Sequence, residues 1–198
     1  MVTKFKRERQ KLERERHFVQ ALANLLPLPV DQYRNPLDVY ARETGVDVIA
    51  VVGKRQIGFQ VTEYEGGEGN SQMKPGQMRA AEMKLKREAG ETGVYGGWGS
   101  PHAEQALSAR ITEKVRKSLD YDFAEYGEVW LLLSANIPGA GTSTFIPYFH
   151  ISSDDLNQWT ASALVRSRYT RAFLHVIMGD TLFGWDLRSG WRKLACRQ

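Results

Sequence analysis

Two short apolar runs joined by a polar loop predict a β-hairpin in the first third of the chain. Residues 46–52 and 57–64 are rich in β-branched and aromatic side chains. Asp47 stands at the start of the first strand, and Gln60 and Thr62 interrupt the second. Because residues two apart on a strand share a face, Gln60 and Thr62 should point together, away from the apolar positions around them. An acid facing such a polar pair suits a small-ion site.

A long amphipathic helix is predicted over residues 4–26, because apolar side chains recur along one stripe until Pro27 and Pro29 end it. Glu8 and Glu15 occupy positions on that stripe. A buried carboxylate without a partner is costly, so Glu15 should pair with a base or bind a cation. The alternative is that the first half of the helix projects beyond the core and leaves Glu15 in water.

The rest of the chain predicts alternating helices and strands. Ser100 is a good N-cap for a helix reaching about Leu119, which buries Leu107, Ile111 and Val115 at i,i+4 spacing. Residues 27–45 are expected to be a connecting segment, with a short strand or turn of helix around 37–42. Further elements are a helix over 77–89, a glycine-rich loop over 90–100, a central strand over 128–135 covered on both faces, a strand over 144–151, a helix capped by Ser153 or Asp154 that reaches about 165, and a second hairpin of 173–178 with 181–187. This order predicts an α/β fold.

Length and composition fit one domain of ordinary size. The chain has 198 residues, 42% of them hydrophobic and 25% charged, so residues 1–198 are expected to share a single core. No apolar run approaches the roughly 18 residues needed to span a bilayer. The amino terminus lacks the apolar core of a secretory signal, and the single cysteine, Cys196, excludes an internal disulfide. We therefore expect a cytoplasmic protein with no membrane partner.

The net charge of +4 is concentrated at the amino terminus. Residues 1–16 carry seven basic and three acidic side chains, while the remaining 182 residues hold 20 of each. Such concentration attracts polyanions, and a smaller basic cluster lies near the carboxyl terminus. The alternative is a solvated helix face held together by i,i+4 ion pairs. The residues expected to contact a nucleic-acid backbone are Lys4, Lys6, Arg7, Arg9, Lys11, Arg14, Arg192 and Lys193.

The elements predicted over residues 8–135 form a series. It consists of a helix bearing an acid, a hairpin with Asp47 on one strand and Gln60 before Thr62 on the next, then a helix and a buried strand. This series resembles the core of the PD-(D/E)XK nuclease superfamily, whose motif is an Asp, a variable spacer, then Glu or Gln, one residue and Lys. Here 12 residues separate Asp47 from Gln60. The resemblance implies a restriction-endonuclease-like mixed central sheet flanked by helices, with residues 144–198 as an extension.

The resemblance also implies a metal site and assigns residues to it. Glu15 would correspond to the family's helix acid, with Glu8 or Glu13 as alternatives. Together with Asp47 and Gln60, which are also the expected catalytic residues, it would hold Mg²⁺ or Mn²⁺. Oxygen ligands suit either ion, which would orient a phosphodiester and lower the pKa of the attacking water.

One position departs from the family pattern. Thr62 stands where the family has its lysine, and a threonine cannot supply an ammonium group to polarise the phosphate. Family members are known in which the lysine has moved to a neighbouring element, which is similar to what Lys74, Lys84 or Lys86 could do, and Lys84 is taken here as the catalytic lysine. Glu63 is a rival metal ligand, but strand alternation puts it on the face opposite that of the polar pair.

Three functional interpretations follow. The first is a metal-dependent nuclease that hydrolyses DNA phosphodiester bonds, and a homodimer stays an open alternative because nucleases that cut both strands often work as dimers. The second is a noncatalytic nucleic-acid- or protein-binding protein on the same scaffold, with Thr62 marking lost chemistry. The third is an α/β domain with no nucleic-acid role, in which Asp47 and Gln60 merely cap strands.

Overall fold

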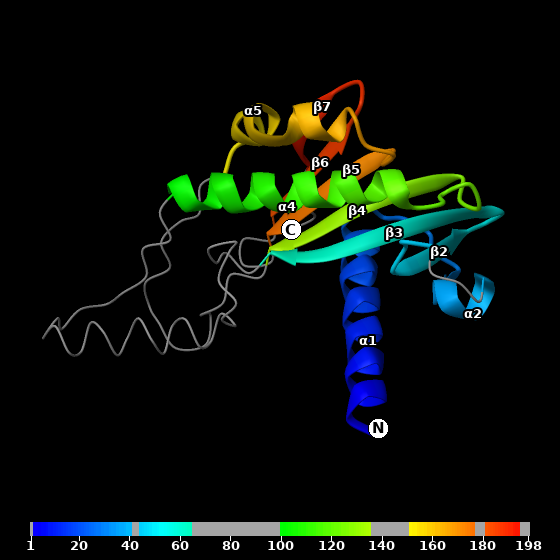
Figure 1. Cartoon of the computed structure of the whole chain (residues 1–198). Helices are drawn as coiled ribbons and strands as arrows, with labels where there is room; N and C mark the ends of the chain where they lie inside the picture. The colour runs from blue at the N-terminus through cyan, green and yellow to red at the C-terminus, as the bar shows by residue number, and fades with distance from the viewer. Residues whose placement is uncertain (1, 41–43, 65–99, 136–150, 177–180, 195–198) are drawn as a thin grey trace, which may run out of the picture.

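The computed structural model describes residues 2–40, 44–64, 100–135, 151–176 and 181–194 as a seven-stranded mixed sheet packed against helices (Figure 1). The protein therefore has an α/β fold. Its elements are α1 (Val2–Leu25), β1 (Gln32–Arg34), α2 (Pro36–Tyr40), β2 (Val48–Val52), β3 (Arg55–Tyr64), α4 (Ser100–Asp120), β4 (Glu128–Ala135), α5 (Ser153–Leu164), β5 (Arg171–Val176), β6 (Thr181–Asp186) and β7 (Gly190–Leu194).

The strands lie in the sheet in their order along the chain. β1, β2 and β3 pair antiparallel, β3, β4 and β5 pair parallel, and β5, β6 and β7 pair antiparallel again. Parallel neighbours need crossover connections that cover the sheet, and α4 and α5 both lie on one face of it, with α1 on the other (Figure 1). The central strands are therefore buried on both sides.

Two hydrophobic layers separate the helices from the sheet. On one face, the predicted stripe of α4 (Leu107, Ile111 and Val115) is buried with Leu131 and Leu133 of β4. On the other face, Phe18, Val19 and Leu22 of α1 pack with Trp130 and Leu132 of β4 and with the odd-numbered positions 57, 59 and 61 of β3. The predicted central strand over 128–135 is confirmed, and its alternate side chains enter opposite layers.

Helix α1 packs against the sheet only through its second half. Its apolar contacts begin near Phe18, where it meets β2 and β3, whereas the described side chains before Glu15 are exposed or half-buried. The amino-terminal half extends away from the sheet into solvent (Figure 1). The projecting helix considered from the sequence is thus observed, but it does not leave Glu15 in water, as described below.

Several predicted boundaries need correction. The first hairpin has a turn of only Gly53 and Lys54, and Gly53 adopts a positive φ of 59° that suits a tight turn. Ser152, rather than Ser153 or Asp154, is the N-cap of α5, because its hydroxyl accepts the Asp155 backbone N–H in a capping box. Strand β7 was not predicted.

Other predicted segments cannot be compared. The helix over 77–89, the glycine-rich residues 90–99 and residues 144–150 of a predicted strand lie outside the described residues. In the part of the chain that is described, no helix is long and apolar enough to cross a membrane.

Candidate functional site

Asp47 directly precedes the first residue of β2, at the point where β3 continues beyond the hairpin. The last backbone pair of the hairpin joins Val48 to Phe59, and β3 then runs on to Tyr64. The Asp47 backbone N–H donates to the Phe59 carbonyl at 2.8 Å, and its Oδ2 accepts the Val61 backbone N–H at 2.8 Å. The carboxylate therefore takes the place of the missing strand and is held at the edge of β3. This capping role is the one that the third interpretation expects of Asp47.

Glu15 approaches the same place from α1. Phe18 and Val19 pack on the sheet and hold the preceding turn of the helix close to it, so Glu15 is only 6% exposed. Its Oε1 lies 3.3 Å from Lys11 Nζ, and the same ammonium lies 4.0 Å from Asp47 Oδ1. Glu15 Oε2 is buried and has no hydrogen-bond partner among the residues that the structure describes. The structure thus brings together the two acids that the sequence singled out.

The other candidate helix acids do not reach this place as far as they are described. Glu13 is exposed and pairs with Arg9 at 3.1 Å along the helix. The backbone of Glu8 lies in α1, and its side chain is outside the described part of the chain. Among the helix acids whose side chains are described, Glu15 is the one that lies beside Asp47.

Burial is the main electrostatic influence on Glu15. Burial and, next, the negative charge of Asp47 raise the pKa of this carboxyl, and Lys11 opposes them, so that the pKa moves from 4.5 to about 7. A buried carboxylate with such a pKa is stabilised by a cation that approaches it.

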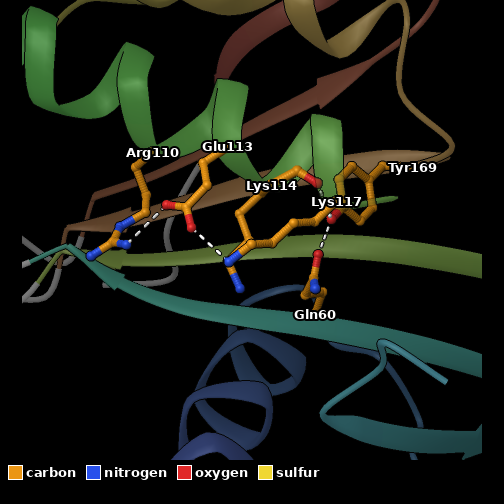
Figure 2. A network of polar contacts seen from close by, with 6 residues as sticks. All are labelled: Gln60, Arg110, Glu113, Lys114, Lys117 and Tyr169. Carbon is orange, nitrogen blue, oxygen red and sulfur yellow. Dashed lines mark hydrogen bonds and ion pairs between the residues drawn. The ribbon is translucent and has the colours of Figure 1, made fainter. Parts of the chain in front are cut away.

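Lys114 brings a further positive charge from the opposite face of the sheet. Its side chain reaches from α4 toward β3 (Figure 2). Burial lowers the pKa of Lys114, while the negative charge of Asp47 acts to raise it. Among the described residues its ammonium group has no hydrogen bond or ion pair, in contrast to neighbouring Lys117, whose Nζ lies 2.6 Å from Glu113 Oε1.

Lys114 differs from the lysines that the sequence pattern suggested for this role. Lys84 and its alternatives, Lys74 and Lys86, lie outside the described residues, and Lys114 was not considered. A signal was nevertheless present, because Lys114 directly precedes Val115 and follows Ile111 by three residues. A lysine at the edge of a buried helix stripe is one that the fold partly desolvates.

Gln60 and Thr62 point together toward α4, as the strand pattern predicted, because their neighbours Phe59 and Val61 face α1. Gln60 is 3% exposed, and its Oε1 accepts a hydrogen bond from the hydroxyl of Tyr169. That hydroxyl also lies 3.2 Å from the carbonyl oxygen of Lys114 (Figure 2). The Gln60 amide oxygen would therefore serve a metal only by giving up Tyr169.

The predicted nucleic-acid contacts fall on two separate elements. Arg9, Lys11 and Arg14 are exposed on the projecting half of α1, next to the acids, whereas β7 lies at the opposite edge of the sheet from β1. Arg192 of β7 pairs with Asp186 at 3.2 Å, and Lys193 is exposed. The structure does not bring Arg192 and Lys193 to the acids. Lys4, Lys6 and Arg7 lie on the same helix as Lys11, but their side chains are not described.

The residues present fit a divalent cation held partly by water. Within the described ranges, no three His, Cys, Asp or Glu side chains form a cluster that would enclose a metal. Glu15 and Asp47 nevertheless offer carboxylate oxygens, one of them buried without a partner. Mg²⁺ usually keeps several waters and is bound by one or two carboxylates together with substrate phosphates. This pair is therefore suited to Mg²⁺ or Mn²⁺ with an anionic substrate.

No family model matches the sequence, and neither a curated protein nor a solved structure matches the chain. What the fold defines is an α/β protein with a seven-stranded mixed sheet. Its function has to be inferred from the geometry around Glu15 and Asp47.

Proposed function

We propose that this protein is a metal-dependent nuclease that hydrolyses DNA phosphodiester bonds on a restriction-endonuclease-like scaffold. The observation that carries the proposal is the buried Glu15 carboxylate, with one oxygen unpartnered, beside Asp47. The order of helix, hairpin, helix and buried strand within a mixed sheet supports the resemblance to the PD-(D/E)XK superfamily. The basic, exposed half of α1 next to the acids supports a polyanionic substrate.

Each residue of the site has a distinct role in this proposal. A bound Mg²⁺ or Mn²⁺ would supply a Lewis acid and an activated water at neutral pH. Glu15 and Asp47 would hold it, and the hydrogen bond from the Val61 N–H fixes the position of Asp47. Lys114 supplies positive charge for the phosphate oxygens, which is the role that Thr62 cannot perform. Exposed Arg9 and Arg14 would contact flanking phosphates.

Cleavage of supercoiled plasmid and of single-stranded DNA at low salt, with Mg²⁺, Mn²⁺ or EDTA, tests the proposal. Wild type should cut with either metal and not with EDTA, and Asp47→Ala should not cut. Asp47→Asn removes the negative charge but keeps the cap on β3, because the asparagine amide oxygen can still accept the Val61 N–H. This variant should also be inactive. Asp38→Ala, on the exposed surface of α2, should cut like wild type. Metal-independent cutting, or full activity of Asp47→Asn, would contradict the proposal.

Lys114→Met is expected to reduce the rate of metal-dependent cleavage by about a hundredfold, the scale of losing one charged contact to a transition state. Methionine keeps the apolar stem of the side chain, so the fold should be retained. Lys117→Met is the matched control, because Lys117 lies one turn further along α4 and pairs with Glu113. Rates should be measured under single-turnover conditions with saturating Mg²⁺. Equal cleavage rates for the two variants would show that Lys114 has no role in the reaction.

A noncatalytic nucleic-acid-binding protein is the second candidate, and two observations favour it. Asp47 and Gln60 both make hydrogen bonds that hold the fold together, so their presence has a structural explanation. Thr62 is buried on the face of β3 that bears Gln60, with no lysine at its position. In this case DNA binding would weaken steeply with salt, and no metal would produce cutting.

A further inference from the structure

Lys11 lies within ion-pair distance of both acids of the site. Its ammonium lies 3.3 Å from Glu15 Oε1 and 4.0 Å from Asp47 Oδ1, so one side chain bridges two elements that are distant in sequence. The Lys11 side chain is 61% exposed, whereas that of Glu15 is 8% exposed. Lys11 therefore lies on the solvent side of the pair, along the route by which a cation from solution would arrive.

We propose that Lys11 is a displaceable resident cation, which neutralises Glu15 and Asp47 in the free protein and leaves them when its ammonium binds a phosphate of the DNA backbone. Divalent metal and DNA would then each increase the affinity of the site for the other. This inference rests on the proposed function, because it assigns a regulatory role within the same site.

The charges of the site require competition between Lys11 and a metal. Both carboxylates attract the Lys11 ammonium, and a divalent cation bound to the same oxygens would repel that ammonium over a few ångströms. Lysine suits such an exchange, because it is a point charge on a flexible stem and lacks the two-pronged fit of arginine to a carboxylate. The Lys11 side chain is 61% exposed, so its ammonium can turn toward solvent, whereas the carboxylates of Glu15 and Asp47 are 8% and 23% exposed. Lys11 can therefore leave when a metal replaces its charge beside the two acids.

The surroundings of Lys11 indicate what would withdraw it. Arg9 and Arg14 are exposed on the same projecting half of α1, so a polyanion attracted to this helix arrives directly beside Lys11. A phosphate that pairs with Lys11 draws this positive charge away from the two acids, and this raises their affinity for a divalent cation. By thermodynamic linkage, the bound metal then favours the DNA-bound position of Lys11 by the same factor.

Mn²⁺ binding, followed by the electron paramagnetic resonance signal of free Mn²⁺, tests the inference without relying on catalysis. Lys11→Met should bind Mn²⁺ about three- to tenfold more tightly than wild type, the scale of removing a weak competing ion pair. Arg9→Met is the matched control. It removes the same charge from the same exposed helix, but Arg9 pairs with Glu13 instead, so its Mn²⁺ affinity should change less than twofold. Asp47→Asn should lose the binding.

A second arm measures the coupling itself. A DNA duplex with a cleavage-resistant phosphorothioate backbone should increase the Mn²⁺ affinity of Lys11→Met through direct phosphate contacts with the metal, and should increase that of wild type by a further factor of about three or more. Equal Mn²⁺ affinities of wild type and Lys11→Met would overturn the inference, as would an absence of Mn²⁺ binding in both proteins.

The proposed function fails by a different result. If wild type and Lys11→Met bind Mn²⁺ as expected but neither cuts DNA, the resident-cation role stands and the nuclease function does not. If wild type cuts DNA with Mn²⁺ and Lys11→Met shows unchanged Mn²⁺ affinity, the function stands and the role of Lys11 is wrong.

Discussion

Glu15→Gln is expected to make the protein more stable at pH 8 by about 2 kcal/mol, and at the same time to abolish metal-dependent cleavage. Burial and the nearby charge of Asp47 raise the pKa of Glu15 from 4.5 to about 7, so ionising this group opposes folding. Glutamine has nearly the same shape and no charge. It therefore relieves the cost of a buried carboxylate and removes a ligand on which the proposed metal depends.

The sign of the pH dependence follows from the direction of this shift. Between pH 4.5 and 7 the folded protein holds a proton on Glu15 that the unfolded chain has released, so the contribution of Glu15 to stability falls as the pH rises through that window. Below it, Glu15 is protonated in both states, and the variant should resemble wild type. Urea denaturation at pH 4 and pH 8 measures the difference.

Glu13→Gln is the control for this prediction, because Glu13 is exposed on the same helix and pairs with Arg9. Its stability should stay within about 0.5 kcal/mol of wild type at both pH values. A Glu15→Gln protein that is less stable than wild type at pH 8 would show that the ionised carboxylate is satisfied in the fold. Opposite effects on stability and on activity would instead identify Glu15 as a residue retained for function at the expense of stability.

Gly45→Ala is expected to destabilise the protein by about 3 kcal/mol, through two effects that act at one position. Gly45 has a positive φ of 76°, in the left-handed region where a side chain adds strain. A Cβ at this position would also overlap the ring of Tyr121, at the atoms closest to its backbone. The ring cannot be cleared by moving only its tip. Urea denaturation measures the change.

Gly53→Ala separates the two effects. Gly53 also has a positive φ, of 59°, but a Cβ there meets no atom within 4 Å, so only the strain of about 1 kcal/mol is expected. Equal losses of stability in Gly45→Ala and Gly53→Ala would mean that the Tyr121 ring moves aside without a cost in free energy. Because Gly45 lies two residues before Asp47, the larger loss should be accompanied by weaker metal binding in the fraction of Gly45→Ala that stays folded.

Local patterns in the sequence were sufficient for most of the described elements. The alternation of side chains predicted the first hairpin and the shared face of Gln60 and Thr62, since a strand has a period of two wherever it lies. Helical periodicity predicted the buried stripe of α4. Strand β7 was not predicted because only one of its residues, Trp191, is buried, so its sequence lacks the apolar alternation of a strand and has the composition of a basic segment. Its edge position in the sheet is a property of the whole fold.

Some features of the candidate site likewise follow from the sequence, and others follow only from the tertiary structure. The sequence by itself determined that Asp47 opens a strand and that Glu15 interrupts an apolar helix stripe, because these are positions in local repeats. Only the tertiary structure decided that Lys11 bridges these acids, that Lys114 approaches from the opposite face, and that Tyr169 occupies the amide oxygen of Gln60. The reason is physical. Charge and hydrogen-bond partners act over a few ångströms in space, and chain periodicity does not show which distant residues the packing of α1, α4 and the sheet will bring within that range.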